Sequence, residues 1–140
     1  MPRDKGKDVT DLEGPDLLFV YGSLQRGERM FTELGLERAL EFVCDGTIRG
    51  NLYDLGDYPG AVAADGVVQG EVYRIKDPAI LAALDEYEEF DPCNRQDSLF
   101  VRELIFVPEA GPAWTYIYNG NREEGRLISS GHWRKPRSAA

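Results

Sequence analysis

The sequence predicts a β-rich α+β fold of about six strands and two helices, arranged around a small closed or strongly curved sheet. Three observations predict this class. Short apolar or alternating runs recur along the chain, turn-forming residues separate them, and only two stretches show helical spacing. The length of 140 residues suits one domain that can bury a core of its own.

The first half of the chain predicts one helix among several strands. The most apolar run, LLFVY at residues 17–21, ends at Gly22 and predicts a buried central strand. Apolar residues at helical spacing predict a short helix within residues 27–36. The other expected elements are a strand at 41–55 interrupted at Gly46 and Gly50, a turn at 57–60, a strand at 61–64, a hairpin turn at Asp65-Gly66 and a strand at 67–75.

The second half begins with the best helix of the chain. Asp77 suits an N-cap, and Pro78 is tolerated at the first helical position. Ile80, Leu81 and Leu84 form the apolar stripe of this helix, which we expect to end before Asp91. The remaining expected elements are a long alternating strand at 99–107, a turn at Gly111-Pro112 and an aromatic strand at 113–118.

We expect residues 15–133 to form this single domain. Residues 1–14 and 134–140 are expected to be flexible tails. The beginning of the chain lacks the apolar segment of a secretory signal, and no apolar run approaches the ~20 residues of a membrane helix. Cys44 and Cys93 do not make a disulfide scaffold, which indicates plain thiols in a reducing cytoplasm.

The charge balance restricts the partners. The net charge of −9 comes from 16 Lys and Arg against 25 Asp and Glu. It argues against nucleic acid, which needs a basic face, and against docking on an anionic membrane. His132 and the two cysteines lack the short spacing of zinc ligands, so we expect no metal site.

Glu88 is the first candidate functional residue. At about 100° per residue, Glu88 lies about 20° from Leu81 around the helix and about 40° from Leu84, so it continues the apolar stripe. The neighbouring acids, including Asp85 and Glu89, fall off this stripe. Partial burial, like charges and the negative end of the helix dipole would together raise the pKa of Glu88 and make it a suitable general base and acid. A Glu that simply reaches water at a fraying helix end is the alternative.

The turn at Tyr21-Gly22-Ser23-Leu24 is the second candidate. A buried strand that breaks at Gly-Ser leaves backbone N–H groups able to hold a carboxylate or an oxyanion. The stretch lacks the G-x-S-x-G pattern of a nucleophile elbow, which argues against a serine hydrolase. A tight turn without function is the alternative.

Arg102 is the third candidate, as a contact of the substrate. It lies on a predicted strand, on the same face as Phe100 and Leu104. An arginine on that face should meet a carboxylate or a ligand, and a structural salt bridge is the alternative.

Taken together and in order, the motifs between residues 17 and 133 resemble the γ-glutamylcyclotransferase-like family. Short bacterial members and γ-glutamylamine cyclotransferases are the closer branch, as the stretch YGSLQRGE and the compact length indicate. The motifs are Y-G-S-L at 21–24, Y-D-L-G-D-Y-P-G at 53–60, G-E-V-Y at 70–73, L-D-E-Y-E at 84–88, F-V-R at 100–102 and W-x-Y-x-Y at 114–118.

The resemblance implies a small mixed β-barrel with flanking helices. It also implies that the loop of Tyr21, Gly22, Ser23 and Leu24 cradles a γ-glutamyl group and that Glu88 is the catalytic glutamate. Three departures from the family pattern are a Glu at position 89 where glycine is common, a Phe at position 100 where tyrosine is common, and His132 in place of an aspartate.

The implied reaction needs no metal or cofactor. The α-amine of a small-molecule γ-glutamyl substrate attacks the γ-carbonyl of the same molecule and releases 5-oxoproline and an amine, with Glu88 moving the proton. A binding module that uses the same pocket without turnover, and a hydrolase in which Glu88 activates water, are the alternatives. We expect a cytoplasmic monomer or homodimer.

Overall fold

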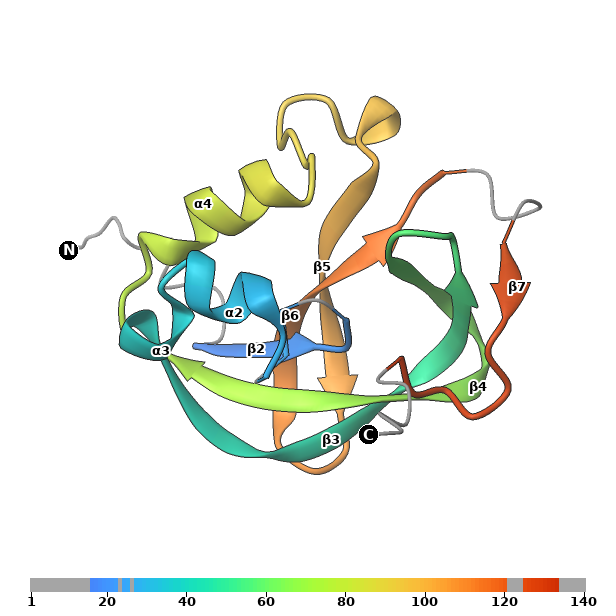
Figure 1. Cartoon of the computed structure of the whole chain (residues 1–140), viewed down its shortest axis with the longest axis horizontal. Coiled ribbons are helices and arrows are strands. Elements are labelled where there is room, and N and C mark those ends of the chain that lie inside the picture. Colours follow the sequence, from blue (N-terminus) through green and yellow to red (C-terminus); the bar gives the residue numbers. More distant parts are fainter. Residues whose placement is uncertain (1–15, 23, 26, 121–124, 134–140) are drawn as a thin grey trace, which may run out of the picture.

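The chain folds into one curled, mixed sheet, as the sequence predicts (Figure 1). The computed structural model describes residues 16–22, 24–25, 27–120 and 125–133, so the two predicted tails lie outside the described residues. The strand order is β5-β6-β2-β4-β3-β7; β2 runs parallel to β6, and the other pairs are antiparallel. The strands are β2 (Leu17–Val20), β3 (Leu40–Asp54), β4 (Pro59–Ile75), β5 (Phe100–Val107), β6 (Gly111–Tyr118) and β7 (Arg126–Leu127).

Short helices cover one side of this sheet (Figure 1). They are α2 (Arg29–Glu33), α3 (Leu36–Ala39) and α4 (Ile80–Tyr87), with a 3₁₀ turn η1 (Arg95–Asp97) after α4. The one helix predicted for residues 27–36 is two helices, because Gly35 adopts a left-handed φ of 70° between them. Helix α4 begins after Asp77, whose carboxylate accepts the Ala79 amide at 3.1 Å.

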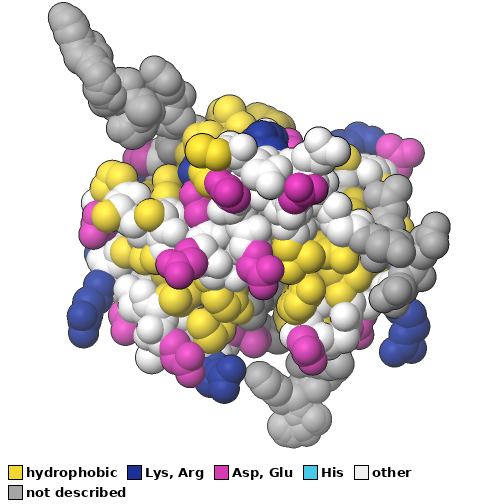
Figure 2. Space-filling view, turned by 90° about the horizontal axis from the view of Figure 1, so that it is seen from above, with side chains coloured by type: hydrophobic (Ala, Val, Ile, Leu, Met, Phe, Trp, Pro, Cys, Tyr) yellow, Lys and Arg dark blue, Asp and Glu magenta, His cyan; other side chains and the backbone are white. Residues whose placement is uncertain are grey.

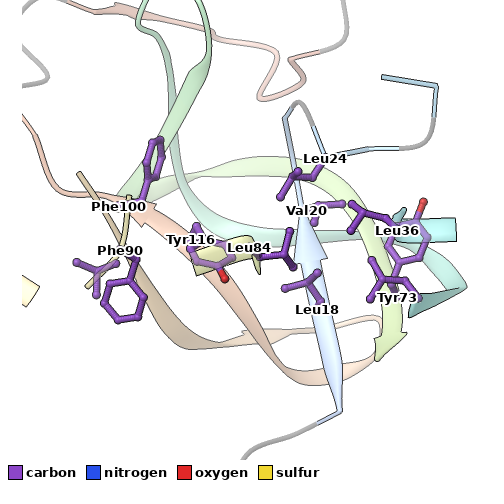
Figure 3. Close-up of a cluster of buried hydrophobic side chains, with 11 residues drawn as sticks. Leu18, Val20, Leu24, Leu36, Tyr73, Leu84, Phe90, Phe100 and Tyr116 are labelled. Atoms are coloured by element: carbon purple, nitrogen blue, oxygen red, sulfur yellow. The ribbon is translucent and has the colours of Figure 1, made fainter. Parts of the chain in front are cut away.

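The central strand β2 separates two hydrophobic clusters. Leu18 and Val20 face the helices, while Phe19 faces the inside of the curled sheet, as alternation along a strand requires. Figure 3 shows the cluster on the helix side, where Leu84 of α4 lies among residues of the sheet. Leu18 and Leu84 are completely buried, so α4 is fixed to the sheet by apolar packing close to its C-terminal end.

Strands β3 and β4 form one long ribbon, so the hairpin predicted at Asp65-Gly66 is wrong. Strand β4 runs through this position, and the true connection between the strands lies at residues 55–58, where the Leu55 amide donates to the Tyr58 carbonyl. The register shifts between Arg49 and Asn51, which leaves residues 63–66 as a bulge. The turn-forming residues therefore bend the strand.

Two other glycines predicted to interrupt or turn the chain lie inside strands. Strand β3 continues through Gly46, where a larger residue would collide with the Val72 and Val107 side chains. Gly111 begins β6 with a φ of 110°, and the turn before it occupies residues 108–110.

Gly70 of β4 lies directly against the end of β2, next to the turn that follows β2. A Cβ at position 70 would collide with the Val20 carbonyl oxygen and the Phe19 ring. We expect Gly70→Ala to lower the free energy of unfolding by about 3 kcal/mol, measured by denaturant unfolding, because the two strands would have to separate. Val67→Ala, an exposed position of the same strand, should cost less than about 1 kcal/mol. Equal losses would contradict this account of the close approach.

Candidate active site

A cavity of about 180 Å³ lies where the ends of β2 and α4 meet the beginnings of β4 and β5 and the middle of β6. Two carboxylates, Glu88 and Glu89, line it from the end of α4, and the rest of the described wall is mainly apolar and aromatic. The structure thus brings together three of the four residues of the predicted loop and the predicted glutamate. The wall also includes Tyr21, Gly22, Leu24, Tyr58, Phe100 and Tyr116.

The end of α4 fixes the position of Glu88. The Glu88 amide donates to the Leu84 carbonyl at 2.9 Å, and the next residue, Glu89, reverses the chain with a φ of 58°. The Glu89 amide donates to Glu86 at 3.1 Å and the Phe90 amide donates to Asp85 at 2.8 Å. These bonds form a Schellman motif, which satisfies the last carbonyls of the helix and buries Phe90 against the core. Glu88 is the last residue before the chain turns away.

Burial raises the pKa of the Glu88 carboxyl from 4.5 to about 8. The sequence predicted this direction from the position of Glu88 on the apolar stripe, and burial is its cause in the structure. The carboxyl is therefore mostly protonated at neutral pH, and it takes up or releases its proton within the range in which enzymes work.

Asp85, one turn earlier, holds the end of α4 onto the sheet. Its carboxylate accepts two bonds from Arg102, at 2.9 and 3.1 Å, and one from the Tyr116 hydroxyl at 2.6 Å. The helical spacing predicts that Asp85 falls off the buried stripe, and this prediction is wrong: only 12% of its side chain is exposed. Three donors compensate the burial of this carboxylate, so it can lie between α4 and strands β5 and β6.

Arg102 is a partner of Asp85 in the structure and does not line the cavity among the described residues. Its guanidinium is 4.8 Å from the centre of the Trp114 ring and 5.9 Å from that of Phe90. Of the two partners that the sequence left open, a carboxylate or a ligand, the structure provides the carboxylate.

The turn after β2 is held by Tyr21 and Gln25. The Tyr21 hydroxyl donates to the Tyr116 carbonyl at 2.6 Å and accepts the Ala61 amide at 3.1 Å, and burial raises the pKa of this phenol well above its usual range. The amide and side-chain nitrogens of Gln25 donate to the Gly22 carbonyl at 3.1 and 3.3 Å. Ser23 lies outside the described residues.

Gly22 is required by a close contact. A Cβ at this position would lie 2.7 Å from the Pro59 ring, so a larger residue would push the turn away from β4. Within the described part of the chain, the Gly22 and Leu24 amides donate to no backbone acceptor. Both residues line the cavity, so the backbone of this turn forms part of its wall.

Sequence reasoning missed most of the cavity wall. Phe100, Thr115 and Tyr116 come from β5 and β6, which lie far from β2 along the chain. Strand β6 pairs with β2, and β5 pairs with β6, so sheet pairing brings these residues to the cavity. A partial signal for Asp85 was present, because Arg102 on the face of Phe100 and Leu104 was expected to meet a carboxylate or a ligand. The described residues contain no group of three or more His, Cys, Asp or Glu placed to hold a metal ion. None of the described helices is long and apolar enough to cross a membrane.

Comparisons with known proteins identify relatives of this chain. The family model described as gamma-glutamyl cyclotransferase, AIG2-like, matches residues 18–135. The gamma-glutamylcyclotransferase family protein YtfP of Escherichia coli K12 is 39% identical over 117 residues, which are 83% of this chain and 94% of that protein. The gamma-L-glutamyl-butirosin B gamma-glutamyl cyclotransferase of Niallia circulans is 35% identical over 106 residues, covering 73% and 66%.

Solved structures share the fold. The solution NMR structure of Escherichia coli ytfP matches with a TM-score of 0.62 and 38% identity, covering 84% of this chain and 95% of that one. The crystal structure of a mouse AIG2-like protein matches with a TM-score of 0.61 and 22% identity, covering 89% and 97%. The predicted α+β barrel-like fold is confirmed.

The buried Asp85–Arg102 pair should contribute much more to stability than the exposed pair between Arg95 of η1 and Glu103 of β5. We expect Asp85→Ala to lower the free energy of unfolding by about 3 kcal/mol, because Arg102 and the Tyr116 hydroxyl lose their partner. The matched control is Glu103→Ala, which breaks the exposed pair with Arg95 and should cost less than about 1 kcal/mol. Denaturant unfolding measures both, and similar losses would refute the role given to Asp85.

Glu88 should make stability fall as the pH rises. Its folded pKa lies above its unfolded value, so between pH 4.5 and about 8 the unfolded chain has released a proton that the folded chain retains. Glu88→Gln has no such proton to release. The free energy of unfolding of this variant minus that of the wild type, the margin, should therefore grow by up to about 1.4 kcal/mol per pH unit across this window. Above about pH 8 the margin should be constant. A margin independent of pH would show that Glu88 has an ordinary pKa.

Proposed function

The chain belongs to the gamma-glutamyl cyclotransferase, AIG2-like family, and we propose that it releases 5-oxoproline from a γ-glutamyl amine or γ-glutamyl amino acid. The observation that carries this proposal is the joint presence of Glu88, with its pKa near 8, and the turn after β2 in one cavity. The Niallia circulans relative, whose name gives it a γ-glutamyl cyclotransferase activity on an acylated butirosin, supports the reaction class.

In the proposed reaction the α-amine nitrogen of the substrate attacks its own γ-carbonyl carbon. Ionised Glu88 accepts a proton from the α-ammonium group, which frees the nitrogen lone pair for attack. A carbon–nitrogen bond closes the lactam ring, and the original amide bond breaks. Glu88 then donates this proton to the departing nitrogen, accepts the extra proton that remains on the ring nitrogen and passes it to the released amine. The products are 5-oxoproline and the amine as an ammonium ion, and Glu88 is ionised again.

Two features of the cavity support this sequence of steps. The attack is intramolecular, so a cavity that holds the γ-glutamyl chain in a folded conformation brings the α-amine close to the γ-carbonyl and accelerates the reaction. The Gly22 and Leu24 amides are the proposed donors to the oxygen that becomes negative during attack, or to the substrate carboxylate.

Arg102 and Tyr21 have positioning roles in this proposal. Arg102 holds Asp85, which holds the end of α4, and Tyr21 ties the turn after β2 to Tyr116 and Ala61. Cys44 and Cys93 are free thiols, which supports the proposed cytoplasmic location.

Removal of the Glu88 carboxyl should abolish turnover. Glu88→Gln keeps the size of the side chain and should lower kcat for 5-oxoproline release at least about a hundredfold, because it removes the proposed general base and the neighbouring Glu89 is exposed. Glu86→Gln, an exposed change on the same helix outside the cavity wall, should leave kcat unchanged. A panel of γ-glutamyl amines and amino acids serves as substrate. Free glutamate as the product would indicate a hydrolase, and binding without product would indicate a binding module.

The pH profile should show the base directly. We expect kcat/KM to rise about tenfold per pH unit below a midpoint near pH 8 and to level off above it, because only ionised Glu88 accepts the proton. A midpoint near 4.5, the ordinary value of a Glu, would contradict the role of burial.

A further inference from the structure

We propose that Glu89 makes the cavity selective for γ-glutamyl derivatives of cationic amines. In such a substrate the leaving amine carries a positively charged group besides the amide nitrogen, such as the terminal ammonium of a diamine. This inference rests on the proposed function and names the substrate class of the same site. The proposed role of Glu89 is specificity, and Glu88 alone moves the proton.

The first support is the position of Glu89. Its side chain lines the cavity next to Glu88 and is itself exposed, which places its charge between the cavity and water. The turn that ends α4 holds this charge in place, because Glu89 is the residue with a left-handed φ between two backbone hydrogen bonds of the helix end. Glycine adopts this φ with less strain than glutamate, so the carboxylate stands at a backbone position that favours glycine.

The second support is the electrostatic field in the cavity wall. Tyr58 lies in this wall, and the pKa of its hydroxyl is raised by burial and then by interactions with Tyr118, Glu89, Asp57 and Glu88. At neutral pH, where Glu88 is mostly protonated, the carboxylates of Glu89 and Asp57 act on this point of the wall. A cation at that point gains energy from both of them, and a carboxylate loses energy.

The third support is the lack of a compensating cation. The described residues that line the cavity include no lysine and no arginine. Arg102 is committed to Asp85, in a pair that is about four-fifths buried. A leaving amine with its own carboxylate, as in a γ-glutamyl amino acid, would thus meet Glu89 without a partner for its charge. Figure 2, which shows the molecule from the side of α4, has Asp and Glu side chains spread across this face and Lys and Arg mainly toward its edge.

The probes for the test are three amides of glutaric acid, which lack the α-amine and therefore bind without cyclising. Their amine parts are 1,4-diaminobutane, n-pentylamine and 5-aminopentanoic acid, so that chains of equal length end in a positive, a neutral and a negative group. Binding is measured by isothermal titration or by NMR titration of backbone amides. We expect the wild type to bind the cationic amide about fivefold more tightly than the neutral amide, which is the effect of one pair of opposite charges about 4 Å apart in water. We expect it to bind the anionic amide more weakly than the neutral amide. High salt should reduce this preference.

Variants separate the charge of Glu89 from its backbone conformation. Glu89→Gln removes the charge and keeps a side chain, whereas Glu89→Gly removes the charge and relieves the backbone. Both should lose the cation preference, by about fivefold relative to the neutral amide. Glu37→Gln, an equal loss of charge on the exposed face of α3, should keep it.

The outcomes distinguish this inference from the proposed function. Equal binding of the three amides by the wild type, or an unchanged preference in Glu89→Gln, overturns the inference. The γ-glutamyl counterparts of the same three amines are then assayed for 5-oxoproline. Turnover without charge preference rejects the role of Glu89 and leaves the proposed function standing. Charge preference in binding without any 5-oxoproline rejects the proposed function and leaves the selectivity of the cavity standing.

Discussion

The contact on which the candidate site depends is the one between the Asp85 carboxylate and its three donors. Asp85 belongs to α4, while Arg102 and Tyr116 belong to β5 and β6, so this carboxylate joins the helix to the far part of the sheet. The same residue accepts the Phe90 amide through its carbonyl and closes the helix end. Glu88 therefore has a fixed place opposite the turn after β2, set by bonds in which it takes no part through its side chain.

Two carboxylates three residues apart thus have opposite environments. Asp85 is buried with compensation by a guanidinium and a phenol. Burial raises the pKa of Glu88 to about 8, and no interaction with another described residue offsets this effect. Asp85 therefore has a structural role, whereas Glu88 can exchange its proton near neutral pH. Neighbouring carboxyl groups in such different environments are typical of acid–base sites. Glu89, exposed beside them, provides charge without burial.

The sequence predicted the parts of this arrangement that depend on local spacing. The apolar run of β2, the helix after Asp77 and the position of Glu88 on its stripe follow from periodicity, and the family resemblance follows from the order of motifs. Asp65-Gly66 was assigned a hairpin because local turn chemistry cannot distinguish a turn from a bulge in a long ribbon. The partner of Asp85 and the wall from β6 depend on contacts between distant segments, which no local pattern specifies.

The central claim is that burial in this cavity turns Glu88 into a base that titrates near neutrality. The most direct measurement is a ¹³C NMR titration of the Glu88 side-chain carboxyl in the wild type, with Glu88→Gln used to assign the signal. The account predicts a single midpoint near pH 8. A midpoint near 4.5, the value of an ordinary solvated glutamate, would contradict it.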